Sequence, residues 1–174
     1  MDILLRQVRI IDPSSPLHHQ VTDVFIQNGM IAETGTIARA ADQEISMEGL
    51  CISPGWVDLF AGFCDPGFEY KETLETGANA AAAGGFTDVF VLPNTNPVLH
   101  NKAGIEYIVQ RSRSLPVHIR PIAAITRNTE GKELAEMYDM HHSGAVAFSD
   151  GTLPVQSSGL LLKALQYVRA IDRT

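Results

Sequence analysis

The fold is decided by the stretch "SPGWVDLFAGFCDPGFEYKETLETG", residues 53–77. Its apolar start is typical of a buried strand, its middle with glycine and proline is typical of a loop, and the segment after Lys71 is typical of a helix. Many hydrolases place metal-binding histidines at such a strand-to-loop step. The centre of this stretch, residues 60–64, contains no histidine. The stretch predicts one strand-loop-helix unit and leaves its chemistry open.

The same order of strand, loop and helix recurs three more times after residue 77. Further strands are predicted at "FTDVFVLPN" (86–94), "HIRPIAAIT" (118–126) and "AVAFSDG" (145–151). Helices are predicted at about 71–84 and at "KAGIEYIVQRSR" (102–113), "KELAEMYDMHHSG" (132–144) and "QSSGLLLKALQYVRAID" (156–172). Apolar strands that alternate with helices predict a parallel sheet covered by helices.

The first 52 residues have a different pattern. Short segments rich in Ile and Val, at 2–12, 23–35 and 43–53, are separated by turn formers. The dipeptide Asn28-Gly29 is a strong signal for a β-hairpin. We therefore predict a small β-rich segment over 1–52 and an α/β part over 53–174.

Four strand-helix units are too few to close an eight-stranded barrel. We expect an α/β fold in which a small β-rich, sandwich-like segment precedes the first half of a (β/α)8 TIM barrel. The alternative is a complete four-stranded open α/β domain, which the length of 174 residues also allows.

The net charge of the chain argues against two classes of partner, and its cysteines and N-terminus indicate its compartment. The formal net charge of -7, from 13 basic and 20 acidic residues, argues against nucleic acid and against an anionic membrane. A small polar metabolite or another protein fits this charge. Cys51 and Cys64 lack a CxxC spacing and are expected to be free thiols. The N-terminus does not resemble a signal peptide, so we expect a cytoplasmic protein.

Candidate functional residues follow the predicted strands, because ligand sites of parallel sheets form at the carboxyl ends of the strands. These positions are 60–67, 93–97, 126–129 and 149–152. His141 and His142 lie at a predicted helix end, where a C-terminal cation and an exposed loop explain them. Cys64 has no neighbouring base that would activate it as a nucleophile.

Several motifs in this order resemble the dihydroorotase family of cyclic amidohydrolases. They are Pro54-Gly55 with Asp58, then Pro66-Gly67, Lys71-Glu72-Thr73, Asn94-Thr95-Asn96-Pro97 and "GAVAFSDG". The resemblance runs from about residue 5 to residue 172 and favours dihydroorotases over hydantoinases. It implies a metal-dependent barrel flanked by a small β-sandwich built from both chain ends.

The resemblance also implies a reaction, the reversible cyclisation of N-carbamoyl-L-aspartate to dihydroorotate in pyrimidine synthesis. In this family a zinc-bound hydroxide attacks the ring amide, since the metal lowers the pKa of water to about 7. The two strand-one histidines of the family fall on Phe60 and Gly62, and neither side chain can bind a metal. Cys64 stands where the family has a substrate-binding arginine, and Asp65 where it has glutamate.

Two residues keep roles that the resemblance implies. Asn94 matches an asparagine that binds substrate, although a turn residue is an equally good interpretation. Asp150 matches a metal ligand at strand four, although the family's two-Asp run is here Asp150-Gly151 and a capping role is more common for such a residue. Asp58 is expected to be buried and hydrogen-bonded.

We therefore expect a dihydroorotase-like protein that has lost catalysis, binds no cofactor although its family uses zinc, and acts through association. Some members of the family without metal ligands are structural partners of aspartate transcarbamoylase, and the open sheet edge also predicts a homo-oligomer. Phe60 and Phe63 are expected to pack as core. One alternative is an active zinc enzyme whose remaining ligands come from missing sequence or another chain. Another is a truncated product.

Overall fold

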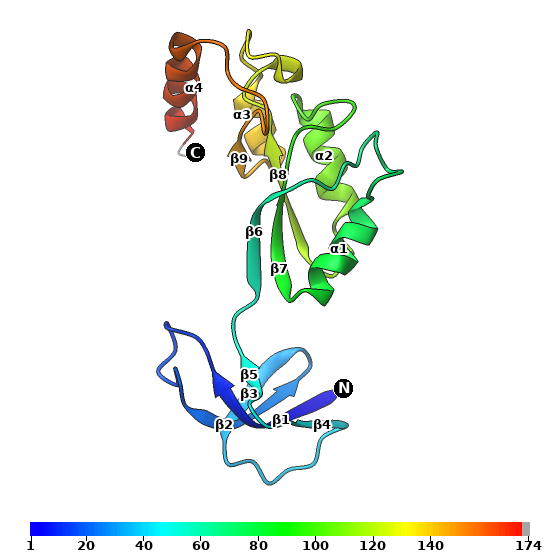
Figure 1. Ribbon diagram of the computed structural model, residues 1–174, viewed down its shortest axis with the longest axis vertical. Coiled ribbons are helices and arrows are strands. Elements are labelled where there is room, and N and C mark those ends of the chain that lie inside the picture. Colours follow the sequence, from blue (N-terminus) through cyan, green and yellow to red (C-terminus); the bar gives the residue numbers. More distant parts are fainter. Residues whose placement is uncertain (172–174) are drawn as a thin grey trace. The chain divides into compact units, whose positions relative to one another are not determined.

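A computed structural model describes residues 1–171 of the chain (Figure 1). The chain divides into two compact units, Met1–Pro54 and a second unit that begins at Gly55. No helix in the described range is long and apolar enough to cross a membrane. Each unit has its own buried core, so the two are described separately.

The first unit is one five-stranded sheet with the strand order β3-β2-β1-β4, in which β5 also pairs with β1. β1 runs antiparallel to β2 and parallel to β4 and β5. The strands are β1 (Asp2–Ile10), β2 (Val21–Gln27), β3 (Met30–Gly35), β4 (Gln43–Ser46) and β5 (Cys51–Ile52). The second layer that would make a sandwich is not among these strands.

Local turn chemistry sets the register of this sheet. Asn28 and Gly29 both have positive φ, 52° and 76°, which a two-residue type I′ hairpin requires. The predicted hairpin is thus confirmed between β2 and β3. The pairing of β1 with β2 shifts in register between Leu5 and Val8, where Gln7 has a positive φ. The buried Asp23 carboxylate stabilises this bulge by accepting hydrogen bonds from the Gln7 N–H (3.0 Å) and from Arg6 (2.8 Å).

The second unit is a parallel four-stranded sheet with the order β6-β7-β8-β9. Its strands are β6 (Trp56–Ala61), β7 (Phe86–Val91), β8 (His118–Ala123) and β9 (Ala147–Phe148). Helices α1 (Leu74–Ala83), α2 (Lys102–Arg111), α3 (Met137–His142) and α4 (Ser158–Ala170) follow these strands in turn. The predicted α/β class with four strand-helix units is confirmed, and the sheet is curled as in part of a barrel (Figure 1).

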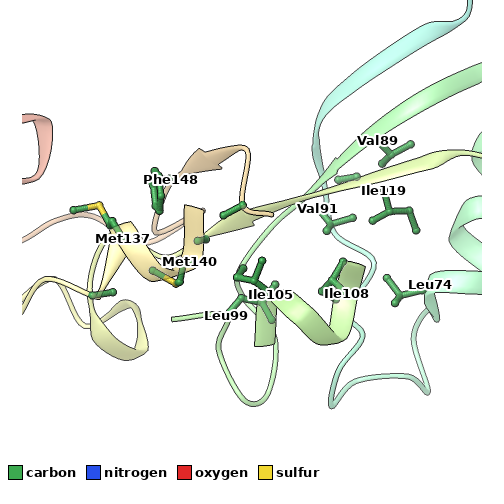
Figure 2. Packing of buried hydrophobic residues seen from close by; sticks show 14 of the residues in the cluster. Leu74, Val89, Val91, Leu99, Ile105, Ile108, Ile119, Met137, Met140 and Phe148 are labelled. Atoms are coloured by element: carbon green, nitrogen blue, oxygen red, sulfur yellow. The ribbon is translucent and has the colours of Figure 1, made fainter. Parts of the chain in front are cut away.

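The core of the second unit lies between the helices and one face of the sheet. Ile105 and Ile108 of α2 are fully buried with Val89 and Val91 of β7. The cluster extends from Leu74 to the side chains of α3 and β9 (Figure 2). Burying an aliphatic side chain of this size contributes about 1.5 to 3 kcal/mol, so this cluster holds the helices on the sheet.

The helix boundaries differ from the predicted ones for local reasons. α1 begins at Leu74 rather than at Lys71, because the Thr73 hydroxyl accepts a hydrogen bond from the Thr76 N–H and caps the helix there. The helix predicted at 132–144 is only α3, residues 137–142. Its first residues instead belong to a folded loop that includes a 3₁₀ turn (Arg127–Thr129) and a bridge between Thr126 and Leu134. Asp172, the end of the last predicted helix, lies outside the described residues.

The expectation that Phe60 packs as core was wrong. Phe60 is 55% exposed and Leu59 is 64% exposed, because β6 is an outer strand of the sheet and only its β7 side is paired. Phe63 is partly buried against the core. In α4, Ala164 and Val168 face the core, whereas Leu161, Leu162 and Leu165 are exposed.

Candidate functional site

The loops that follow the four strands meet at the carboxyl edge of the sheet, and Asp150 lies at the centre of their contacts. Asp150 is 3% exposed. Its Oδ1 accepts a hydrogen bond from the Thr126 N–H (2.9 Å) and its Oδ2 accepts one from the Thr126 hydroxyl (2.5 Å). The Thr126 hydroxyl oxygen in turn accepts the Gly131 N–H (2.8 Å). The carboxylate therefore joins the loop after β9 to the loop after β8.

Asn94, from the loop after β7, contacts the same point. Its Nδ2 donates to the Asp150 carbonyl oxygen at 3.1 Å. Gly151 has a φ of 65°, and a Cβ there would lie 1.7 Å from Asn94 Oδ1, so the close approach requires glycine. The structure thus brings the two predicted site residues together. We call Asn94, Thr126, Gly131, Asp150 and Gly151 the Asp150 network.

The motifs after β6 and β7 interlock through their backbones. The Asn96 N–H donates to the Pro66 carbonyl at 2.9 Å. Gly67 has a φ of 95°, and a Cβ there would lie 1.9 Å from the Asn96 carbonyl oxygen. Pro66-Gly67 and Asn94-Thr95-Asn96-Pro97 are therefore two halves of one packing contact.

Asp65 anchors the loop after β6 to two helices. This carboxylate is 5% exposed, and its Oδ1 accepts the Tyr107 hydroxyl of α2 at 2.8 Å. Its Oδ2 accepts the Leu74 N–H at the start of α1 (3.2 Å), where the helix dipole favours a negative charge. Burial, and after it the hydrogen bond to Asp65, raise the pKa of the Tyr107 phenol. Tyr107 therefore stays a donor to Asp65 at neutral pH.

The other candidate residues have local roles. Asp58 is half-buried, and its carboxylate accepts the Phe60 N–H at 2.9 Å. Cys51 and Cys64 are free thiols, as predicted, and Cys64 has a positive φ of 63°. His142 ends α3, with its Nδ1 2.9 Å from the Tyr138 carbonyl oxygen.

The comparison with family models decides the membership of the chain. The model described as Dihydro-orotase-like matches residues 49–174, which include every strand and helix of the second unit. The chain belongs to the dihydroorotase-like family. The predicted resemblance is thereby confirmed.

Curated relatives agree with the family model over nearly the whole chain. The dihydroorotase of Syntrophus aciditrophicus (strain SB) is 42% identical over 177 residues, which cover 99% of this chain and 41% of the relative. The dihydroorotase of Pelotomaculum thermopropionicum is 44% identical over 168 residues, or 96% of this chain and 39% of the relative. The chain thus spans about 40% of the length of these relatives.

Solved structures show the fold. The L-hydantoinase of Arthrobacter aurescens superposes with a TM-score of 0.78 at 21% identity, over 99% of this chain and 39% of that one. A dihydroorotase structure superposes with a TM-score of 0.65 at 19% identity, over 99% of this chain and 49% of that one. The chain shares its fold with these two proteins over nearly its whole length.

The residues present do not fit the zinc that the family implies. Phe60 and Gly62, which the resemblance matches to the two strand-one histidines of the family, have no side-chain lone pair to donate. Both oxygens of Asp150 accept hydrogen bonds from Thr126. Across residues 1–171, no group of three or more His, Cys, Asp and Glu side chains could hold a metal ion.

Sequence reasoning missed Thr126 and Tyr107. Thr126 was among the positions that follow a strand, but one threonine carries no signal that it will bind a carboxylate 24 residues away. Tyr107 lies on a helix 42 residues from Asp65, and only the packed structure brings the two together.

We expect Thr126→Val to lower the free energy of unfolding of the second unit by about 3 kcal/mol, because it leaves Asp150 Oδ2 and the Gly131 N–H without partners. Urea denaturation followed by circular dichroism at 222 nm measures this, since the described helices all belong to the second unit. The control is Thr152→Val, an exposed site two residues from Asp150. Equal stability of both variants would contradict the role of Thr126.

Tyr107→Phe is expected to lower the free energy of unfolding by about 1 kcal/mol at pH 8, because the phenol donates to a buried carboxylate while Tyr107 itself is 36% exposed. The folded pKa of Tyr107 is raised, so the contribution of this residue is complete below the ordinary phenol pKa of about 10 and is lost as pH rises further. The difference from the unmodified chain should therefore shrink above pH 10.

The measurement is denaturation at several pH values between 8 and 11. Tyr138→Phe, which removes an exposed phenol of the same unit, is the matched control. A difference between Tyr107→Phe and the unmodified chain that stays constant to pH 11 would count against the Tyr107–Asp65 interaction.

Proposed function

We propose that the chain is a dihydroorotase-like protein of pyrimidine biosynthesis that no longer catalyses the cyclisation of N-carbamoyl-L-aspartate and acts through association. The observation that supports this proposal is a well-packed loop frame around positions that the resemblance assigns to metal ligands but that carry no ligating side chain. Pro66-Gly67 keeps its backbone contact with Asn96. Within that frame Phe60 and Gly62 offer no donor to a metal, and Cys64 offers no cation to a substrate carboxylate.

We further infer that the second unit is the first half of an eight-unit barrel, and that the first unit is one layer of a β-sandwich. The parallel order β6-β7-β8-β9 supports this, since β6 and β9 each have a side without a strand among the described residues. The greater length of the curated relatives is consistent with it. Asn94 keeps a candidate substrate-binding group in this proposal, because its Oδ1 is buried without a hydrogen-bond partner among the described residues while its Nδ2 contacts Asp150.

Exposed apolar side chains favour association. On the outer strand β6, Trp56 is 62% exposed, Leu59 64% and Phe60 55%. On α4, Leu162 is 56% exposed and Leu165 60%. Apolar surface on an open sheet edge and on a helix is typical of protein interfaces. We propose a homo-oligomer and an aspartate transcarbamoylase, the enzyme that makes carbamoyl-aspartate, as partners in the cytoplasm.

We expect the chain purified without chelators to contain less than stoichiometric zinc and to show no cyclisation of N-carbamoyl-L-aspartate in zinc-containing buffer. The reason is that a catalytic zinc needs three protein ligands. Elemental analysis and a dihydroorotate absorbance assay test this. The Syntrophus aciditrophicus dihydroorotase, prepared in the same way, is the positive control. Turnover with bound zinc would establish the alternative of an active enzyme.

We expect light scattering to give a mass well above the 18.9 kDa of the monomer. The double substitution Leu162→Asp and Leu165→Asp should reduce that mass, because it places charges on the exposed apolar face of α4. Lys163→Ala, on the same helix, should leave it unchanged. A stable monomer at high concentration would contradict the homo-oligomer, and the absence of a transcarbamoylase from pull-downs would contradict that partner.

A further inference from the structure

A polar pocket lies between the loops that follow β7 and β8, beside the Asp150 network. Its volume is about 360 Å³, within the range of about 300 to 1,000 Å³ of small-molecule sites. One side is His100, and the other is the loop of residues 126–133. The lining side chains are His100, Arg127, Asn128, Glu130, Lys132 and Glu133.

Hydrogen bonds to Asp150 and Gln156, which do not line the pocket, fix the 126–133 loop. Thr126 is bound to Asp150 at its N–H and its hydroxyl. The Gly131 N–H donates to the Thr126 hydroxyl oxygen, and the Gly131 carbonyl accepts the Gln156 N–H at 3.2 Å. A site on such a loop is pre-organised, so a ligand loses little free energy in ordering it.

The backbone of this loop is also in an unfavourable conformation. Asn128 and Thr129 have φ values of 52° and 56°. Left-handed backbone is rare for a β-branched residue such as Thr129 and costs roughly 1 to 3 kcal/mol per residue. Non-glycine residues in this conformation are concentrated at ligand-binding positions. Here the conformation places the Asn128 side chain on the pocket wall.

The charges of the pocket are balanced and weakly paired. Arg127 Nη1 lies 3.4 Å from Glu133 Oε1, with the two side chains 60% and 69% exposed. Lys132 Nζ lies 3.5 Å from Glu130 Oε2, with exposures of 69% and 54%. Exposed pairs of this kind contribute only about 0 to 1 kcal/mol. Both signs of charge are therefore available to a ligand at little cost.

His100 provides a further polar atom. Its Nδ1 is buried and has no hydrogen-bond partner among the described residues. The side chain of His100 itself lines the pocket.

We propose that this pocket binds a small zwitterion of the α-amino acid class. A ligand with only a carboxylate would separate Arg127 and Lys132 from their glutamates and leave those glutamates near the added negative charge. A ligand with only an ammonium group would do the converse. A zwitterion pairs with both signs at once, and His100 and Asn128 remain to bond its side chain.

The probes are the common L-amino acids, screened against the full chain by thermal shift. Isothermal titration calorimetry then compares the strongest with its N-acetyl derivative and its carboxamide, which each lack one charge. We expect saturable binding of the zwitterion and at least about tenfold weaker binding of each derivative. Absence of saturable binding by any amino acid, or equal binding of either derivative, would overturn the proposal.

Variants locate the site. Arg127→Ala and His100→Ala should each weaken binding at least about tenfold, because each removes a polar side chain that lines the pocket. Lys163→Ala, a charge change on α4 outside the pocket, should bind as the unmodified chain does. Circular dichroism of every variant confirms that it is folded. Unchanged affinity in both pocket variants would show that the pocket is not the site. Neither result depends on whether the chain cyclises carbamoyl-aspartate.

Discussion

The hydrogen bonds between the buried Asp150 carboxylate and Thr126 are the constraint on which the loop face of the second unit depends. A carboxylate that is 3% exposed costs several kcal/mol to desolvate unless donors meet both oxygens. Thr126 meets both, with its N–H and its hydroxyl. This requirement fixes where the loop after β8 begins, and through the Gly131 N–H it fixes where that loop returns. Gly151 follows because only glycine tolerates the approach of Asn94.

The loops that follow β6 and β7 are also held by contacts within the protein. Asp65 joins the loop after β6 to both α1 and α2, and Gly67 packs on the Asn96 carbonyl. These contacts use backbone groups and buried carboxylates, so they do not require the side chains at positions 60 and 62. The loop contacts are therefore compatible with the Phe60 and Gly62 that this chain carries.

The sequence predicts the parts of this structure that rest on local signals. Asn28-Gly29 specifies its hairpin, and alternating apolar strands and helices specify the four units. The sequence correctly predicts that Asn94 and Asp150 lie at the same edge of the sheet, because the carboxyl ends of parallel strands coincide. Long-range contacts could not be predicted in this way. The helix expected at 132–144 begins only at Met137, because the bond of Gly131 to Thr126 and the Thr126–Leu134 bridge hold the preceding residues in a loop. The apolar character of Phe60 predicted a core position. Apolar character does not reveal that β6 is an outer strand, and in the structure Phe60 is exposed.

Strand β6 leaves both apolar side chains and backbone hydrogen-bonding groups uncovered among the described residues. Trp56, Leu59 and Phe60 are each more than half exposed. An aromatic side chain left in water forgoes about 1.5 to 3 kcal/mol that its burial would contribute. The open side of β6 also presents unpaired backbone groups, which can pair with another strand. A segment packed against β6 would bury these side chains and pair these backbone groups, whether it came from more of the same chain or from a partner.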